Sequence, residues 1–238
     1  METISIEYIF TLADGSKEAF DLQLNSNSLS LRGICHENLP PWTMLEFHQC
    51  PHCPLTKDTH PRCPLAVNLV NIVERFGRLI SYDEIQVEVL TEERLVSQKI
   101  AAHEGISSLM GLVIATSDCP HTGFFKPMAR FHLPFATHEE TIWRAIAAYL
   151  ITQYFLNVQG KRIDLELEGL TQIYDNMEIL NAAIVKRLRS ASKEDSTVNA
   201  LIHLDIFAKL LAPGLQESLN VLQKIFTPFL TTYNDTVD

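Results

Sequence analysis

Four cysteines, each followed directly by a proline, are the residues of this chain best suited to chemistry. They are Cys50, Cys53, Cys63 and Cys119. Three of them fall within residues 48–64, whereas the fifth cysteine, Cys35, is followed by His36 and stands apart. Because proline makes up only about 5% of an average sequence, four such pairs indicate a shared structural role.

The spacing of these four cysteines is typical of a metal site. Cys50 and Cys53 are separated by two residues, so a tight turn can bring both sulfurs to one ion. A third thiolate and a distant fourth then complete a tetrahedral shell with Zn–S bonds of about 2.3 Å. Proline favours an extended conformation in the residue before it, which stiffens each cysteine. The sequence therefore predicts a four-thiolate metal site formed by Cys50, Cys53, Cys63 and Cys119.

The identity of the metal stays open at the level of sequence. Zinc is favoured by four thiolates, and a [4Fe–4S] cluster is the alternative because it uses the same ligation. The observed spacing of two and then nine residues matches neither a ferredoxin run nor the paired short motifs of a zinc ribbon. A histidine could also replace one cysteine, since Cys₃His shells occur. The histidines beside the predicted ligands are His48, His52, His60 and His121.

Thiols at this spacing also have uses that need no metal. Cys50 and Cys53 have the spacing of a redox pair, but Pro54 follows at once where a thioredoxin-like motif requires a helix. The N-terminus has neither a basic region nor a long apolar core, so we expect no secretory signal and a cytoplasmic protein. Structural disulfides are disfavoured in that compartment. Inert buried thiols are the remaining alternative.

Known catalytic motifs are absent from the sequence. It contains no Gly-rich phosphate loop, no Gly-x-Ser-x-Gly and no His-Glu-x-x-His. Lys126, Arg130 and His132 could line an anion-binding pocket, although Arg130 paired with a carboxylate and His132 packed on aromatic rings is the simpler interpretation. We therefore expect a binding or regulatory protein. An iron–sulfur redox or sensor protein, or a metal-dependent enzyme that uses Arg130 and His132, is the alternative.

The charge balance of the chain argues against two classes of partner. Its 238 residues carry a formal net charge of −10, with 29 acidic and 19 basic residues. Nucleic acids and anionic membranes are bound through clusters of Lys and Arg. No uninterrupted apolar stretch reaches the roughly 18 residues of a transmembrane helix. We expect a protein partner, no nucleic acid and no membrane, while the oligomeric state stays open.

Residues 1–100 are predicted to be mostly strands and the cysteine knuckle. Alternating apolar residues predict a β-hairpin over 3–24 with a turn at Asp14-Gly15, followed by a short third strand at 29–31. A second hairpin over 85–95 joins the first in an antiparallel sheet. Between the two hairpins, helical spacing after Cys63 predicts a helix that starts there and stops at Gly77.

Residues 101–238 are predicted to be helical. A helix from Ala101 to Ser117 delivers Cys119, and Thr137 with Glu140 forms a capping box for the next helix. Three further apolar stripes predict helices over 170–188, 198–211 and 215–229, the second of them ended by Pro213-Gly214. Basic residues near the end of the first stripe suit its helix dipole: Lys186, Arg187 and Arg189.

These elements together predict an α+β protein. We expect an N-terminal antiparallel sheet with a cysteine metal knuckle, packed on a C-terminal bundle of antiparallel helices. Because Cys119 ties the helical half to the knuckle, we expect a single domain over 1–238.

Four stretches of the sequence resemble a bacterial family of uncharacterised proteins. They are Cys-Pro-His-Cys-Pro-Leu (50–55), Cys-Pro-Leu-Ala (63–66), Ser-Asp-Cys-Pro-His (117–121) and Pro-Met-Ala-Arg-Phe-His-Leu-Pro-Phe (127–135). The resemblance extends over nearly the whole chain. It implies a bacterial, intracellular setting but no activity, so the metal prediction rests on the residues themselves.

Overall fold

Two β-hairpins form one antiparallel sheet in the N-terminal part of the chain. The computed structural model describes residues 3–32, 38–77, 79–191 and 195–237, so Cys35 lies outside the described residues. The strands are β1 (Thr3–Thr11), β2 (Lys17–Asn25), β3 (Glu84–Leu90) and β4 (Leu95–Ala101), in the order β2-β1-β3-β4. The prediction of two hairpins in one antiparallel sheet is confirmed, and the fold is α+β.

The alternation of the strands places one face of the sheet in a core. Ile6, Tyr8 and Phe10 of β1 are buried, and the turn between β1 and β2 uses the left-handed backbone of Gly15 at φ 84°. The predicted short strand at 29–31 is reduced to an isolated bridge between Leu24 and Leu31.

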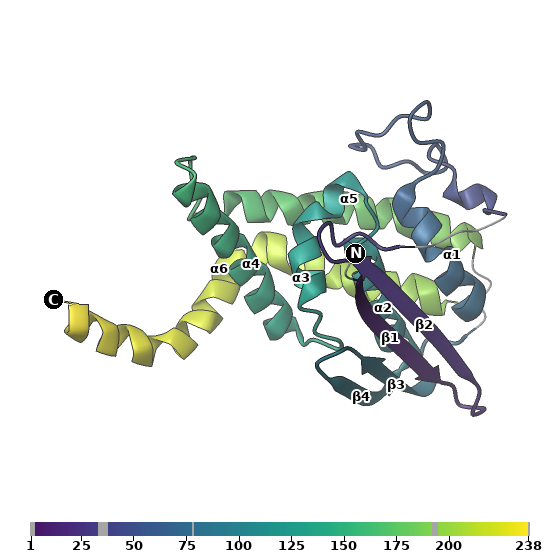
Figure 1. Cartoon of the computed structure of the whole chain (residues 1–238), viewed down its shortest axis with the longest axis horizontal. Helices are drawn as coiled ribbons and strands as arrows, with labels where there is room; N and C mark the ends of the chain where they lie inside the picture. Colours follow the sequence, from purple (N-terminus) through teal and green to yellow (C-terminus); the bar gives the residue numbers. More distant parts are fainter. Residues whose placement is uncertain (1–2, 33–37, 78, 192–194, 238) are drawn as a thin grey trace. The chain divides into compact units, whose positions relative to one another are not determined.

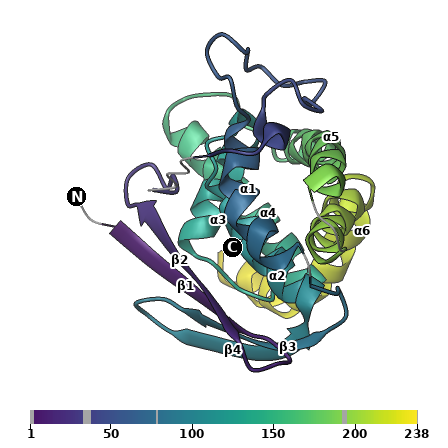
Figure 2. The same cartoon turned by 90° about the vertical axis from the view of Figure 1, so that its right-hand side faces the viewer.

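Two helices cover the buried face of this sheet. They are α1 (Pro64–Phe76) and α2 (Ala102–Ala115), which lie side by side in Figure 2. The ring of Phe76 on α1 packs on Phe10 and Phe20, with centroids 4.8 and 5.3 Å away. Helix α2 approaches so closely that a Cβ built on Gly105 would lie 2.8 Å from Cγ2 of Val87. Both helices follow the predicted pattern.

Contacts divide the chain into two compact units. The first contains Met1–Phe135 and Asn176–Ile206, and the second contains Ala136–Asp175 and Phe207–Asp238. The remaining elements are η1 (Pro41–Thr43), η2 (Pro120–Phe125), α3 (Lys126–Arg130), α4 (His138–Val158), α5 (Glu168–Ala191) and α6 (Ser196–Val237), labelled in part in Figure 1. In the first unit, α6 is anchored at its start by the hydroxyl of Ser196, which donates to the carbonyl oxygen of Phe76 over 2.6 Å.

The second unit begins with the predicted capping box. The amide of Glu140 donates to Oγ1 of Thr137 over 3.2 Å, and the amide of Thr137 donates to Oε2 of Glu140 over 2.8 Å. The inner face of α4 is tied to the following loop, because the hydroxyl of Tyr149 donates to Oδ2 of Asp164 over 2.6 Å. The amide of Gly169 donates to the same carboxylate oxygen over 2.8 Å.

The prediction that Pro213-Gly214 separates two helices is wrong. A single helix, α6, runs from Ser196 to Val237. An interior proline costs a helix one hydrogen bond and about 3 kcal/mol, but it does not end the helix when burial on both sides offsets that cost. Leu201 before the proline and Leu222 after it are both buried. In the described part of the chain, no helix is long and apolar enough to cross a membrane.

Candidate metal centre

The four predicted cysteines lie at tight turns and helix starts of the first unit. The amide of Cys53 donates to the carbonyl oxygen of Cys50 over 3.0 Å, which closes a turn between them. Cys63 precedes α1 and Cys119 precedes η2, each in an extended conformation before its proline. The predicted position of Cys63 at a helix start is therefore confirmed, and Cys63 and Cys119 have the extended backbone that their prolines favour.

Hydrogen bonds draw the segments that carry these cysteines together. His121, two residues after Cys119, donates from Nε2 to the carbonyl oxygen of His52 over 3.1 Å. The amide of Cys63 donates to the carbonyl oxygen of Thr43 over 2.9 Å. Residues 50–53 are thus joined to the start of η2, and Cys63 is joined to the segment that precedes the Cys50 turn.

The four thiols are close enough to influence one another electrostatically. Burial raises the pKa of Cys119 to about 12, and the thiols of Cys63, Cys50 and Cys53 add to the rise. Burial also raises the pKa of Cys50 to about 11, again with contributions from Cys63 and Cys53. In the absence of an ion these two thiols are therefore protonated near neutral pH.

At Cys63, the start of α1 offsets part of the rise in thiol pKa that burial causes. Burial raises the pKa of the Cys63 thiol, whereas hydrogen bonds from the amides of Ala66 and Leu65 lower it, as does the positive charge of Arg187. Backbone amides at a helix N-terminus carry partial positive charge and stabilise an anion there. The surroundings of Cys63 thus combine an apolar environment with donors that suit a thiolate.

Arg187 is a fully buried cation beside the cysteines. It is 1% exposed, and its Nη1 donates to the carbonyl oxygens of Trp42 and Met44 over 2.7 Å each, while Nη2 donates to that of Leu45 over 2.8 Å. Burial lowers its pKa, and the thiols of Cys63, Cys50 and Cys53 act in the opposite direction.

Within the part of the chain that the structure describes, the guanidinium of Arg187 has no compensating carboxylate. No ion pair of these residues includes Arg187, and its Nε has no hydrogen-bond partner. From the sequence, we expected Arg187 only to suit the dipole near the end of its helix. Its burial was not predicted. The available signal was its position three residues after Ile184 and seven after Leu180, on the apolar stripe of α5.

Two histidines pack beside the cysteines in a defined tautomer. The rings of His52 and His121 stack with centroids 3.9 Å apart. Nε2 of His52 lies 3.1 Å from the carbonyl oxygen of Asn176, and because a carbonyl can only accept, Nε2 carries the proton. The buried Nδ1 of His52 has no hydrogen-bond partner. A histidine held in this way by a carbonyl has the arrangement of a metal-binding imidazole.

Two of the other predicted substitutes for a cysteine are exposed to solvent. His60 is exposed and its Nδ1 lies 3.0 Å from Oγ1 of Thr59. His48 is exposed and packs edge-on against Phe47, with centroids 4.8 Å apart. Of the predicted substitutes His48, His60 and His121, His121 makes the contact that joins the two cysteine turns.

Left-handed backbone occurs one or two residues upstream of two of the cysteines. His48 has φ 49° and Asp118 has φ 60°. Such conformations cost non-glycine residues of the order of 1–3 kcal/mol and are found where surrounding structure enforces them. The carboxylate of Asp118 is held by the hydroxyl of Ser30 and by the ammonium of Lys126, over 2.5 and 2.7 Å. The chain therefore accepts local strain where it turns toward Cys50 and Cys119.

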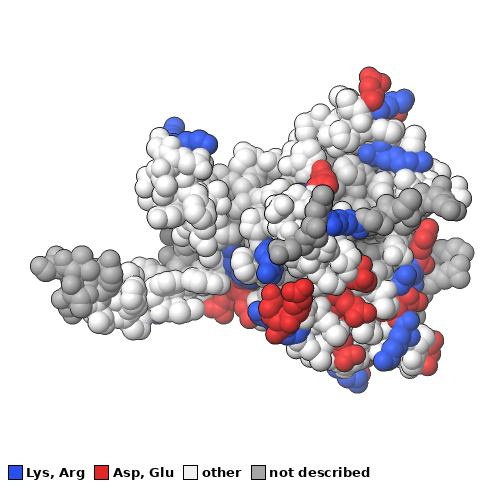
Figure 3. Space-filling view, in the orientation of Figure 1, with Lys and Arg blue, Asp and Glu red and all other residues white. Residues whose placement is uncertain are grey.

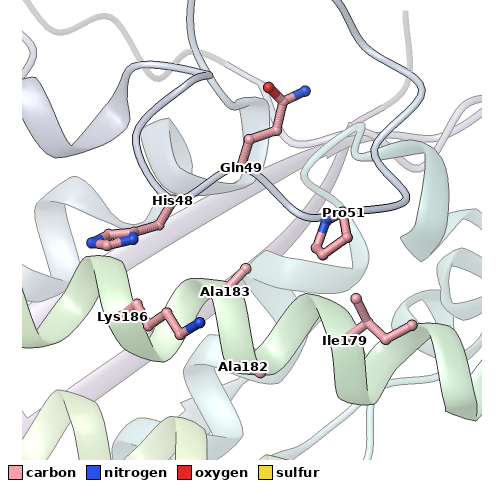
Figure 4. A pocket seen from close by; sticks show the side chains of 7 residues that line it. All are labelled: His48, Gln49, Pro51, Ile179, Ala182, Ala183 and Lys186. Atoms are coloured by element: carbon pink, nitrogen blue, oxygen red, sulfur yellow. The ribbon is translucent and has the colours of Figure 1, made fainter.

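A pocket of about 340 Å³ borders the Cys50 turn. Figure 4 shows His48, Gln49 and Pro51 on one side and α5 on the other, with the side chain of Gln49 pointing away from the helix. Helix α5 contributes Ile179, Ala182, Ala183 and Lys186. The pocket therefore brings two basic side chains, those of His48 and Lys186, beside the segment that carries Cys50.

The three residues of the predicted anion-binding pocket have separate partners. Lys126 pairs with Asp118, and Arg130 pairs with Glu93 over 3.5 Å while its guanidinium lies over the ring of Phe131. His132 contacts the hydroxyl of Tyr8 through Nε2. The contacts of Arg130 and His132 thus follow the simpler interpretation of the sequence, a carboxylate for one and an aromatic residue for the other.

A formed metal knuckle, which the predicted fold included, is not seen. Within the ranges that the structure describes, no group of three or more His, Cys, Asp or Glu side chains is arranged to hold a metal ion. Cys50, Cys53, Cys63 and Cys119 are free thiols. The physical reason is that neutral thiols have no attraction for one another, so only an ion would draw four sulfurs to a common centre.

Comparison with known proteins identifies the family of the chain without adding a function. No curated protein and no solved structure matches it. The model of a domain of unknown function, DUF6901, matches residues 6–227, which include all four predicted metal ligands. The match covers most of the sequence, so the chain belongs to the family of this domain of unknown function, DUF6901.

Proposed function

We propose that Cys50, Cys53, Cys63 and Cys119 bind one zinc ion, which acts as a structural staple in a binding or regulatory protein that meets a protein partner. The ion would tie the Cys50 turn, the start of α1 and the start of η2 to one another. The observation that carries this proposal is the buried guanidinium of Arg187 beside the cysteines, with no carboxylate to balance it among the described residues.

A buried cation is costly unless a negative charge or several hydrogen bonds compensate it. Three carbonyl oxygens supply part of that compensation for Arg187. The remaining partners are thiols, and burial keeps those of Cys50 and Cys119 protonated near neutral pH. Zinc changes this balance, because metal binding deprotonates its cysteine ligands. Four thiolates around Zn²⁺ carry a net charge of two minus, which supplies the negative charge that Arg187 lacks.

In this proposal, zinc binding draws the four cysteine side chains to a common centre. Tetrahedral bonds of about 2.3 Å bring the sulfurs to roughly 3.5–4 Å from one another. The backbone segments are already joined by His121 and His52 and by Cys63 and Thr43. We therefore expect rotations of the cysteine side chains rather than a rearrangement of the fold.

A [4Fe–4S] cluster is the second candidate, because its four thiolates would balance Arg187 by the same electrostatic argument. Such a cluster would give the protein a redox or sensor function instead of a structural metal. Among histidines, His52 is the proposed substitute for a fourth cysteine, since its Nδ1 is buried and has no hydrogen-bond partner.

Elemental analysis of the full chain, purified without oxygen, tests the proposal directly. We expect one zinc per chain, no iron and no absorbance near 400 nm. Iron with a brown colour and absorbance in that region would establish the cluster instead. Protein that holds neither metal, and whose thiols all react with a thiol reagent in the native state, would show that the cysteines form no metal centre.

A further inference from the structure

Helix α4 in the second unit is apolar on two opposite sides. Its inner side is buried through Ile142, Ala145, Ile146 and Tyr149. The opposite side exposes large apolar residues at helical spacing: Trp143, Leu150, Ile151, Tyr154, Phe155 and Val158. Tyr154 and Val158 are 63% and 67% exposed. A helix at the surface normally presents polar residues there, whereas a helix that is apolar all round is normally buried.

The C-terminal part of α6 extends this apolar surface within the same unit. The rings of Trp143 and Phe226 stack with centroids 5.5 Å apart, which joins α4 to this part of α6. Beyond that contact α6 exposes Val221, Ile225, Phe229 and Leu230. We refer to these exposed apolar residues of α4 and α6 as the α4–α6 face.

The α4–α6 face carries almost no charge. Residues 145–160 contain no Asp, Glu, Lys or Arg, and Lys224 is the one charged residue in 218–234. On the side shown in Figure 3, charged side chains are correspondingly sparse over the second half of α4 and the adjoining part of α6. A helix that lies on a membrane surface typically carries several Lys and Arg on its polar side, whereas Arg144 is the one such residue in the sequence of α4.

We propose that the α4–α6 face binds the same face of a second copy of this chain. Two copies with a net charge of −10 each repel one another, and contact through a nearly uncharged surface such as the α4–α6 face adds least to that repulsion. Symmetric dimers pair one patch with itself and have interfaces that are more apolar than the rest of the surface.

The area of the face is sufficient for a stable dimer. Large apolar side chains have surfaces of the order of 150–250 Å², so the ten exposed here, each about half exposed, offer roughly 1,000 Å² per copy. A typical stable interface buries about 800 Å² per partner. The proposal is independent of the metal, because all of these residues belong to the second unit and the four cysteines belong to the first.

Light scattering after size exclusion, together with sedimentation over a wide range of concentrations, tests the dimer on the full chain. We expect a mass of about twice 26.9 kDa for the natural sequence. Tyr154→Glu places a charge at the centre of the α4 stripe and should weaken the dimer by at least about tenfold. The matched control is Ile80→Glu, at an apolar residue of the first unit that is 56% exposed. The control should remain dimeric.

Far-UV circular dichroism distinguishes lost pairing from lost folding. If Tyr154→Glu loses helix content, Ile151→Glu replaces it as the test variant. A monomeric natural protein, a dimer that survives a folded charge variant, or a dimer that Ile80→Glu also disrupts overturns the proposal. A monomer that floats with phosphatidylcholine vesicles would likewise overturn it, and would assign the face to a lipid surface.

Discussion

His121 donates its Nε2–H to the carbonyl oxygen of His52 over 3.1 Å, and the two imidazole rings stack 3.9 Å apart. The two residues are 69 positions apart in the sequence. Each lies within two residues of a predicted metal ligand, so the pair brings the Cys119 turn to the Cys50 turn without any ion. The segments around a metal site at this point would therefore already be held together by the fold.

Cys119→Ser should lose the metal, because a structural zinc site needs its fourth position filled by the protein. Structural zinc contributes on the order of 10 kcal/mol in small zinc peptides, and we expect a smaller loss of a few kcal/mol here because a chain of this size buries its own core. Elemental analysis and thermal unfolding measure the two effects. Cys35→Ser is the control and should keep its metal. If Cys119→Ser keeps its metal and Cys35→Ser loses it, the fourth ligand is Cys35 and not Cys119.

Arg187→Met should lower metal affinity by about 10- to 100-fold, the usual effect of removing a group that supports metal ligands. The reason is that the thiolates of Cys63, Cys50 and Cys53 would lose the buried cation that acts on them. Arg187→Lys should recover part of the affinity, because it keeps the charge and loses the fork that reaches three carbonyl oxygens.

Competition with a chelator measures these affinities, and the exposed Arg189→Met is the matched control. Stability alone does not decide the role of Arg187, since its loss also leaves buried carbonyl groups without donors. If Arg187→Met is less stable but binds metal as tightly as the natural sequence, Arg187 stabilises the fold and does not support the metal.

Gly105→Ala should destabilise the first unit by about 1–3 kcal/mol, because the new methyl group would lie 2.8 Å from Val87 on the sheet. The better helix propensity of alanine offsets up to about 1 kcal/mol of that loss. Denaturant unfolding measures the change. Val87→Ala in the same chain should recover part of it, whereas Gly123→Ala, whose added Cβ meets nothing within 4 Å, should be nearly neutral. Additive effects of the two changes at 105 and 87 would argue against the contact.

Tyr149→Phe should weaken the second unit at neutral pH and have less effect in acid. Burial raises the pKa of Tyr149 to about 12, with its hydrogen bond to Asp164 adding to the rise, and that same hydrogen bond lowers the pKa of Asp164. A lowered carboxyl pKa contributes stability above the unfolded value of about 3.9, and the contribution is lost as the pH falls through the folded value.

The natural sequence and Tyr149→Phe should therefore differ in their urea unfolding midpoints at neutral pH. This difference should narrow as the pH falls below about 4. Urea unfolding across this range measures the effect. A difference that stays constant from neutral to acidic pH would show that Asp164 does not contribute through its charge.

Local patterns in the sequence were sufficient to predict most of the elements. Alternation in β1 and β3, the cysteine before α1 and the capping box at Thr137 each depend on neighbours within a few residues, and each appears in the structure. The α+β class follows from these elements. Pro213 misled the prediction of α6, because whether a proline ends a helix depends on burial along the whole element and not on the local pattern.

The surroundings of the candidate site could be predicted less completely. The proline after each of the four cysteines indicated that they belong to one site. The other residues around this site are distant in sequence. Arg187 bonds to carbonyl oxygens that are more than 140 residues upstream, and His52 to that of Asn176. Neither contact leaves a periodicity or a spacing that a single sequence reveals.

The contact between Arg187 and Leu45 also sets an order of events during synthesis. The two residues are 142 positions apart, and a ribosome adds roughly 5–20 residues per second. For about ten seconds, the segment that carries Trp42 and Leu45 is therefore outside the ribosome without the guanidinium that later binds its carbonyl oxygens. Cys50, Cys53 and Cys63 emerge during that interval, ahead of Cys119. In the nascent chain, an ion captured early would be held first by three thiolates, and the fold would close on it only when Cys119 and then Arg187 arrive.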